Sequence, residues 1–308
     1  MPELDAKRHY SHPVKAACAL LNGKAIPLRR TGVCRVTKQL ITGLESGQVA
    51  GYVLLCGEPE RVPRISSMLE DHKEVVRVRE YTIHLGSIDG TPVTVASTGI
   101  GGPSTAILIE ELANLGAHTF IRIGTSGGMA DGLEKGDFVV ATGAIKADGT
   151  SRSYTWQEYP ALADYEVVTA LVDSASRAGK RYDIGIGLSV DGFYSENKVL
   201  VKGEVASMSH SGYTPSFMSD RLEDAKMMNV KNIEMENGTI FTLCSLFGLR
   251  GGAICTVSDV VPWQPTDSAL DSDQNMVDCI KIGVDAMRTL ISWDRLAGKG
   301  KHWCPSML

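Results

Sequence analysis

The residues that could do chemistry gather at glycine-rich turns that follow apolar runs. In the run Phe120–Gly128, Arg122 lies within an apolar stretch, and Thr125 comes directly after Gly124. Small residues, a hydroxyl and a guanidinium at the end of a strand suit a tetrahedral oxyanion such as phosphate. A guanidinium within an apolar strand also needs an anion as its partner. The sequence therefore predicts an anion site at this turn.

Two further turns add charge of both signs. Gly57 and Arg61 bound a Gly-Glu-Pro-Glu-Arg turn, and Arg79 lies in a charged stretch further along. Glu234 and Glu236 lie at the start of a predicted apolar helix, where a half-buried carboxylate is typical of a functional site. Because sites in open α/β sheets form beyond the carboxyl ends of strands, we expect an arginine cradle opposite two carboxylates.

These turns require a framework in which strands and helices alternate. Strands are predicted at 51–56, 119–124, 137–145, 184–191 and 252–258, with a hairpin over 76–97 turned at Asp89-Gly90. Helices are predicted after the 57–61 turn, from Pro103 to Gly116, and at 165–178, 218–228, 237–248 and 273–292. The pattern indicates an α/β single domain with a central mixed β-sheet and helices on both faces.

Composition narrows the class of protein. The 308 residues are 43% hydrophobic and carry a net charge of −5 with dispersed basic residues, which favours one large core and no nucleic-acid partner. Seven cysteines without a C-x-x-C pair, and seven histidines without ligand spacing, predict no metal site. No apolar run reaches membrane-spanning length and no signal peptide is recognisable, so we expect a cytoplasmic protein without a membrane partner. The expected divisions are an N-terminal extension at 1–48, a domain at 49–295 and a C-terminal tail at 296–308.

Five blocks give the chain a specific resemblance: Thr98–Ser104 with the following Glu-Glu-Leu, Phe120–Gly127, Asp148–Ser151, Glu158–Asp164 and Asn232–Glu236. From about residue 50 to 292 the chain resembles nucleoside phosphorylases of the first structural superfamily, the purine nucleoside/uridine phosphorylase family, and is closest to the uridine phosphorylases. The resemblance implies their type of α/β fold. It also implies reversible phosphorolysis of uridine to uracil and ribose 1-phosphate.

The resemblance also implies a role for individual residues. Phosphate would be bound by Gly57, Arg61, Arg79, Arg122 and Thr125, with Arg79 supplied by a neighbouring subunit. The ribose would contact Glu234, Met235 and Glu236, and the base would contact Phe193, Asn197, Ser126 and Gly127. The catalytic residues would be Arg122, Glu236 and Asp259.

No cofactor is implied, because inorganic phosphate is a co-substrate and is held by the protein itself. The resemblance does allow a monovalent cation near Glu80, Ile100 and Ser104. The partners would be a nucleoside, phosphate and further copies of the chain, in a homodimer or in a hexamer built as a trimer of dimers.

Elementary chemistry agrees with these roles. Cleavage of an N-glycosidic bond develops positive charge at C1′ and negative charge on the leaving base. A phosphate dianion held beside C1′ stabilises the first charge and then attacks, so no protein nucleophile is required. A carboxylate on the ribose hydroxyls fixes the sugar and adds negative potential near the cation.

Four positions depart from the uridine phosphorylase pattern. Asn197 and Val199 stand where a Gln and an Arg usually read the uracil edge, and Val33 stands where a His is often found. Asp259 stands where purine-cleaving relatives carry an acid. It could protonate a base or simply belong to a loop.

Ordinary structural roles also remain open for several site candidates: Arg61 as a helix-start residue, Glu234 as a first-turn acid, Met235 and Phe193 as core side chains. Three alternatives to phosphorolysis of uridine therefore remain. They are a purine or broad-specificity nucleoside phosphorylase, a nucleosidase that uses water, and a catalytically weak nucleoside-binding homologue. The retained arginines argue against the nucleosidase, because water needs no arginine cage.

Overall fold

The computed structural model describes residues 18–21, 24–27, 37–216, 220–263, 273–298 and 302–307. The chain divides into two compact units, Met1–Val36 and Thr37–Leu308. In the smaller unit, β1 (Cys18–Leu21) and β2 (Lys24–Pro27) pair as an antiparallel hairpin. Val33 lies outside the described residues. Residues 37–48 of the predicted extension belong to the larger unit, where the backbone amides of Ile41 and Thr42 both donate to the buried carboxylate of Glu111.

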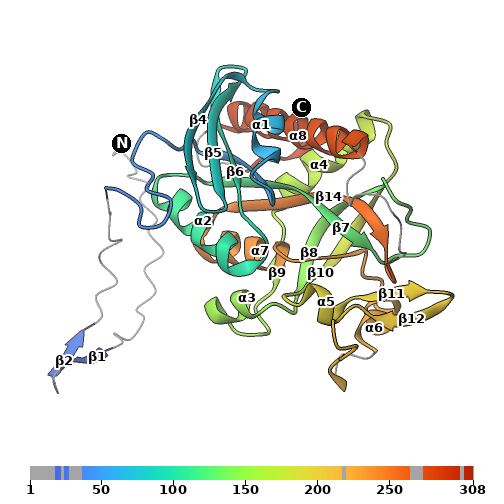
Figure 1. Ribbon diagram of the computed structural model, residues 1–308. Helices are drawn as coiled ribbons and strands as arrows, with labels where there is room; N and C mark the ends of the chain where they lie inside the picture. Colours follow the sequence, from blue (N-terminus) through green and yellow to red (C-terminus); the bar gives the residue numbers. More distant parts are fainter. Residues whose placement is uncertain are drawn as a thin grey trace, which may run out of the picture. The chain divides into compact units, whose positions relative to one another are not determined.

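A mixed sheet forms the centre of the larger unit (Figure 1). Its strands run in the order β13-β10-β8-β14-β7-β3-β6-β5-β4, and the short β9 pairs with β8. In chain order they are β3 (Tyr52–Cys56), β4 (Glu70–Val78), β5 (Tyr81–Ile88), β6 (Thr91–Ser97), β7 (Thr119–Gly128), β8 (Phe138–Lys146), β9 (Ala161–Leu162), β10 (Tyr182–Ser189), β13 (Asn232–Glu234) and β14 (Arg250–Val260). The pairs β3–β6, β3–β7, β7–β14, β8–β10 and β10–β13 are parallel, whereas β4–β5, β5–β6 and β8–β14 are antiparallel.

The three-residue strand β13 closes part of this sheet into a ring. It runs parallel to β10, and it also pairs antiparallel with the end of β7, where Ile233 lies opposite Gly127 and Asn232 opposite Gly128. The ring passes through β7, β14, β8, β10 and β13. The start of β13 is therefore held against the carboxyl end of β7, and its last residue, Glu234, lies beside Ser189 at the carboxyl end of β10.

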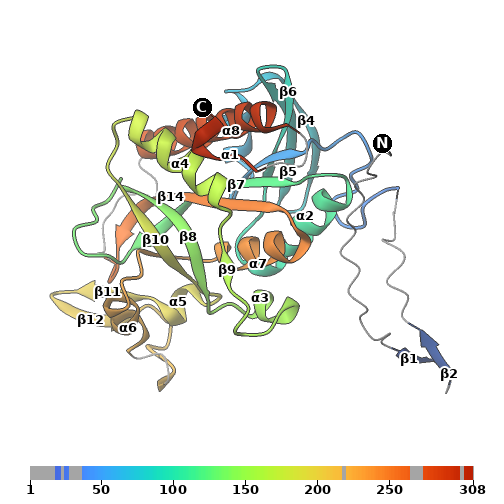
Figure 2. The same ribbon diagram turned by 180° about the vertical axis from the view of Figure 1, so that it is seen from behind.

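Helices cover both faces of the sheet, as the two opposite views show (Figures 1 and 2). One face carries α1 (Arg61–Ser66), α4 (Tyr165–Arg177) and α8 (Asp273–Ala297). The other face carries α2 (Gly102–Asn114) and α7 (Asn237–Phe247), with α3 (Gly149–Tyr154) beside α7. The segment between β10 and β13 contains α5 (Phe193–Glu196), the hairpin of β11 (Lys198–Val201) and β12 (Glu204–Ser207), and α6 (Arg221–Met227). The short 3-10 helix η2 (Pro305–Met307) ends the described chain.

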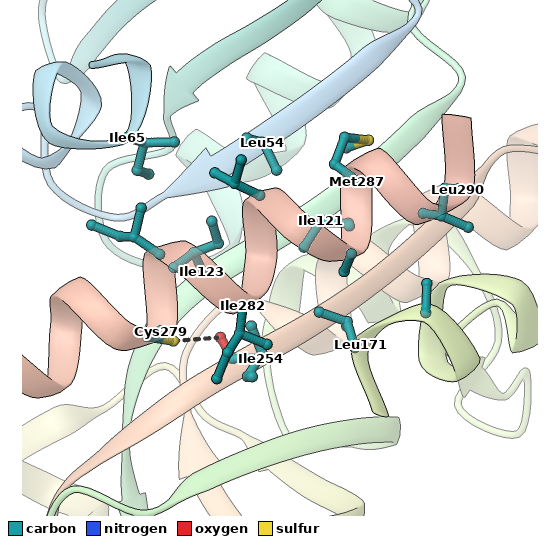
Figure 3. Close-up of a cluster of buried hydrophobic side chains, with 14 of the residues drawn as sticks. Leu54, Ile65, Ile121, Ile123, Leu171, Ile254, Cys279, Ile282, Met287 and Leu290 are labelled. Atoms are coloured by element: carbon teal, nitrogen blue, oxygen red, sulfur yellow. Dashed lines mark hydrogen bonds between the residues drawn. The ribbon is translucent and has the colours of Figure 1, made fainter. Parts of the chain in front are cut away.

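Strand alternation divides the core between the two faces. Leu54 and Ile121 pack under α8, with Ile123, Ile254 and Leu290 in the same layer (Figure 3). The strand neighbours Val53, Leu55 and Phe120 belong to the core on the opposite face. Side chains two residues apart share a face of a strand. Because helices cover both faces of the sheet, the strands are buried on both sides, and their sequences are continuous hydrophobic runs.

The predicted fold class is confirmed, and most predicted elements lie within a few residues of their observed bounds. The turn at Asp89-Gly90 joins β5 to β6 as expected, but the charged segment 70–78 adds a third antiparallel strand, β4, at the edge of the sheet. Only residues 76–78 of this segment fell within the predicted hairpin, and exposed, charged residues are common in edge strands. The helix predicted at 273–292 continues to Ala297, and α3, α5, β9, β11, β12 and β13 were not predicted. Among the described helices, none has the length and apolarity needed to span a bilayer.

Candidate functional site

A cavity of about 210 Å³ lies beyond the carboxyl ends of β3, β7, β10 and β14. This is the position at which ligands bind in open α/β sheets. We call it the central cavity. Its lining consists of Gly57, Glu58, Arg61, Ile100, Arg122, Thr125, Ser126, Gly127, Val190, Phe193, Asn197, Ile233, Glu234, Met235, Glu236, Ser258 and Trp263.

Arg122 is a buried charged residue of the cavity. It alternates with Ile121 and Ile123 in β7, so its side chain lies on the α7 face, and it is 4% exposed. The guanidinium folds over Gly124, where a Cβ atom would lie only 2.6 Å from Arg122 Nη1. A glycine at this position is therefore required for close approach of the side chain to its own strand.

The partners of Arg122 come from α7, β13 and β14. Arg122 Nη2 forms a short ion pair with Glu236, Nη1 lies 3.3 Å from Glu234 Oε2, and Nη1 also donates to Cys255 Sγ at 2.9 Å. Burial works to lower the pKa of Arg122, but Cys255 and the two carboxylates outweigh it and hold that pKa above its ordinary value. Burial raises the pKa of the Cys255 thiol to about 11, so this group stays protonated beside the arginine.

Glu236 is held at the start of α7 with both carboxylate oxygens engaged. Oε2 pairs with Arg122, and Oε1 accepts a hydrogen bond of 2.6 Å from the backbone N–H of Gly101. Gly101 has φ +88°, a left-handed conformation that favours glycine. The turn before α2 is thus shaped to present an amide to this carboxylate.

Glu234 binds the backbone at the start of α7. Its Oε2 accepts hydrogen bonds of 2.8 Å from the backbone N–H groups of Glu236 and Asn237, and its Oε1 accepts from the Ser189 hydroxyl. A carboxylate at these amides satisfies the otherwise unpaired N-terminal donors of α7 and complements the helix dipole. Desolvation by burial raises the pKa of Glu234, although Arg122 opposes that shift. Glu234 therefore positions Glu236 as much as it lines the cavity.

One end of the cavity is lined by Arg61, Arg122, Thr125 and Gly57. Arg61 begins α1, is 2% exposed, donates from Nη1 to the Ile123 carbonyl at 3.4 Å and lies 3.0 Å from Glu58 Oε1. The structure thus brings together four of the five predicted phosphate residues. Arg79 is the exception: it lies exposed at the β4–β5 turn with φ +53° and does not line the cavity within one copy.

The opposite end of the cavity has apolar and aromatic walls. Phe193 and Trp263 lie with their ring centroids 5.7 Å apart, beside Val190 and Ile233. Asn197, the predicted base reader, is 2% exposed; its Nδ2 donates to the Phe193 carbonyl at 2.7 Å and its Oδ1 accepts from Trp263 Nε1 at 3.1 Å. Its amide thus fixes these walls. Ser126 and Gly127 line the cavity as predicted, together with the unpredicted Ser258.

The predicted acid Asp259 and two of the three residues predicted near a cation, Glu80 and Ser104, are not part of the cavity lining. Asp259 is not part of the lining, and its Oδ1 accepts from the backbone N–H of Val260 at 2.8 Å. A Cβ placed on Gly99 would lie 2.8 Å from Glu80 Cγ and 3.2 Å from Ser104 Oγ, and Ile100 is the next residue in the chain. The three residues suggested for a monovalent cation are therefore neighbours. Among the described residues, no group of three or more His, Cys, Asp or Glu side chains could hold a metal ion.

Within this cavity one buried guanidinium, that of Arg122, contacts both carboxylates. The family model of the phosphorylase superfamily matches residues 52–289, which include every cavity residue. The chain belongs to the phosphorylase superfamily. The match covers the larger unit from β3 to most of α8.

Individual relatives agree with this assignment. The chain is 43% identical over 264 residues to a uridine phosphorylase of Thermococcus kodakarensis, an alignment that covers 85% of this chain and 90% of the relative. It is 36% identical over 244 residues to a uridine phosphorylase of Escherichia coli, covering 79% and 94%. It is also 41% identical over 214 residues to a guanosine phosphorylase of Halorubrum lacusprofundi, covering 70% and 80%.

Proposed function

We propose that this protein catalyses the reversible phosphorolysis of uridine to uracil and ribose 1-phosphate. The observation that carries the proposal is the contact between Arg122 and Glu236 within the central cavity, since it places an anion-binding group directly beside a sugar-binding carboxylate. The relatives named uridine phosphorylase support the nucleoside.

Phosphate enters the end of the cavity lined by Arg61, Arg122, Thr125 and Gly57. The two guanidiniums are 2% and 4% exposed, so little solvent screens their attraction for a dianion. Phosphate replaces Glu236 on Arg122 and is held without being protonated. It is then positioned to stabilise positive charge at C1′ and to attack that carbon.

Glu236, once released from Arg122, accepts hydrogen bonds from the ribose 2′- and 3′-hydroxyls. The Gly101 amide and the two amides bound by Glu234 keep its backbone and carboxylate in place. Met235 completes the sugar pocket, and Phe193 with Trp263 encloses the base. The electrons of the broken C1′–N bond leave with the base, which is then protonated.

The charge balance of the cavity favours a site completed by a second copy. The described lining holds two arginines against three carboxylates, namely Glu58, Glu234 and Glu236. A phosphate dianion gains from a further cation, and the exposed Arg79 at the β4–β5 turn is available to a neighbouring copy. We therefore propose a homodimer, or a hexamer built from dimers, in which Arg79 reaches the partner's phosphate. Glu80, the Ile100 carbonyl and Ser104 offer the oxygen ligands that suit a monovalent cation near the same edge.

A second candidate substrate is a purine nucleoside. The resemblance to a guanosine phosphorylase favours it, and the base end lacks the Gln and Arg that usually read uracil. Asp259 does not line the cavity, so protonation of a purine by that residue is not favoured by its position.

The test is release of free base from uridine, inosine and guanosine, each with and without phosphate. We expect base release from uridine that requires phosphate and yields ribose 1-phosphate. Base release without phosphate would point to a nucleosidase, and no release from any nucleoside would overturn the proposal. Arg122→Ala, with its fold checked by circular dichroism, should abolish turnover if the site is correctly placed.

A further inference from the structure

The two terminal nitrogens of Arg122 have different surroundings. Nη2 contacts one side chain of the described chain, the carboxylate of Glu236. Nη1 lies among three acceptors that come from three elements: Cys255 Sγ in β14 at 2.9 Å, Glu234 Oε2 in β13 at 3.3 Å and Asn237 Oδ1 in α7 at 3.4 Å. One nitrogen is therefore held on several sides, whereas the other depends on a single partner.

We propose that Cys255 and Asn237 are positioning residues, which hold Nη1 of Arg122 in place while Nη2 exchanges Glu236 for phosphate. The inference rests on the proposed function and deepens it, because it names the groups that orient the phosphate-binding guanidinium. Neither residue lines the central cavity, so both act on phosphate through Arg122.

The register of the sheet places Cys255 at the guanidinium. Cys255 of β14 lies opposite Gly124 of β7, and the guanidinium folds back over Gly124. Ala253, two residues before Cys255, belongs to the core on the α7 face, so the thiol points to the same face as Arg122. Cys255 is 1% exposed, and its sulfur is thus confined beside Nη1.

The Cys255 thiol is a neutral acceptor. Burial raises its pKa to about 11, although Arg122 opposes that shift, so the sulfur stays protonated near neutral pH. A neutral sulfur accepts a hydrogen bond from the guanidinium without cancelling its charge. A third carboxylate at this position would instead compete with phosphate, as Glu236 does. The thiol therefore fixes Arg122 and leaves its charge available to a dianion.

Asn237 supplies a second neutral acceptor from the first residue of α7. It is fully buried, and its backbone N–H donates to Glu234 Oε2 at 2.8 Å, which fixes the position of the residue. Its Oδ1 faces Nη1, while its Nδ2 has no hydrogen-bond partner among the described residues. The reverse orientation of the amide would set two donors against each other. The amide is thus turned towards Arg122.

Holding one nitrogen sets the direction of the other, because the guanidinium is planar and rigid. When phosphate displaces Glu236 from Nη2, the contacts at Nη1 keep the plane of Arg122 in place. Without these neutral acceptors, the guanidinium is free to turn towards Glu234 and Glu236, and phosphate meets a misplaced donor. The expected consequence is weaker phosphate binding with little change in nucleoside binding.

The test is initial-rate phosphorolysis of uridine with each substrate varied in turn. Cys255→Ala removes an acceptor and should raise the KM for phosphate by about five- to tenfold, with the KM for uridine within about twofold of the wild type. Cys255→Ser retains an acceptor and should restore the phosphate KM. An unchanged phosphate KM in Cys255→Ala, or a serine variant as impaired as the alanine variant, would overturn the inference.

A second pair of variants tests the need for neutral groups. Asn237→Asp keeps the size of the side chain but adds a negative charge at Nη1, so it should raise the phosphate KM more than Asn237→Ala does. Equal effects of the two variants would contradict a role for neutrality.

Cys244→Ala is the matched control. Cys244 is also 1% exposed, lies in α7 and is not part of the cavity lining. Its substitution should lower the melting temperature and leave both KM values unchanged. If Cys244→Ala raised the phosphate KM as much as Cys255→Ala, a loosened core would explain both results and the inference would fail.

If no nucleoside is cleaved, the proposed function fails, but the inference is still decided by binding. Calorimetric titration with inorganic phosphate should then show similar affinity for the wild type and Cys255→Ser, and weaker affinity for Cys255→Ala. Equal affinity of all three proteins would contradict the positioning role. A wild-type protein that binds no phosphate would overturn the inference together with the proposed function.

Discussion

The substitution Glu236→Gln should have opposite effects on the two substrates, because Glu236 holds Arg122 before phosphate arrives. Both side chains are almost fully buried. An ion pair at contact in surroundings of effective dielectric constant about 20 contributes on the order of 4 kcal/mol before desolvation is counted. Phosphate must displace this interaction to reach the guanidinium.

The same substitution should weaken the interaction with the nucleoside. A neutral amide cannot provide the charge-assisted hydrogen bonds to the ribose hydroxyls, each worth about 1.5–3 kcal/mol. We therefore expect kcat/KM for uridine to fall by roughly 10- to 150-fold in the Glu236→Gln variant. Over the same experiment, the KM for phosphate should decrease by about tenfold, since one charged competitor for Arg122 has been removed.

The assay is initial-rate kinetics with each substrate varied in turn. Glu111→Gln is the matched control: it removes a buried carboxylate that accepts two backbone hydrogen bonds, from Ile41 and Thr42, away from the cavity. It should lower the melting temperature and leave both KM values unchanged. A phosphate KM that stays constant or rises in Glu236→Gln would refute the idea that Glu236 competes for Arg122.

Three further predictions concern stability. Gly252→Ala places a Cβ atom 2.3 Å from Cγ1 of the fully buried Val167, so thermal unfolding should show a loss of about 1–3 kcal/mol with unchanged kinetics. Partial desolvation lowers the pKa of His118 below its ordinary 6.5. Its contribution to stability is therefore present above about pH 6.5 and is lost as pH falls through the native pKa. Denaturant titrations should show a flatter pH dependence of unfolding in His118→Gln, and an unchanged slope would contradict this. Arg250→Met strands the carboxylates of Glu166 and Asp294 and should cost about 3–5 kcal/mol in urea unfolding, whereas a loss below 1 kcal/mol would show that the ion pairs are dispensable.

Local patterns in the sequence were sufficient to predict that Arg122 and Glu236 belong to a site. Arg122 could be placed because a guanidinium in an apolar strand followed by glycine has few other uses, and Glu236 because an acid preceded an apolar helix. The structure brings both to one cavity, in contact with each other. The strands and long helices were predictable for the same reason, since their hydrophobic periodicity is local.

The contacts at the aromatic end of the cavity could not be predicted, because they join residues that are far apart in the sequence. Asn197 looked available for a ligand, but it bonds to Trp263, which lies 66 residues away in the chain. Ser258 enters the cavity through a bulge that alternation in β14 does not reveal. Asn232 starts a three-residue strand, too short to show a period, and its partner Ser126 lies 106 residues away. A fully buried asparagine near a cavity was the signal that could have drawn attention to it.

The closure of the strand ring by β13 also has a consequence for folding. The pairing of Ile233 with Gly127 joins parts of the chain that are more than 100 residues apart, and the same closure brings Glu236 to Arg122. Contacts of such long range carry a large loop-closure entropy and tend to form late. A chain that has formed its separate strands and helices but not this ring has no complete anion site. Phosphate should therefore slow unfolding in stopped-flow experiments without accelerating refolding, so that the substrate protects the enzyme only after the ring has closed.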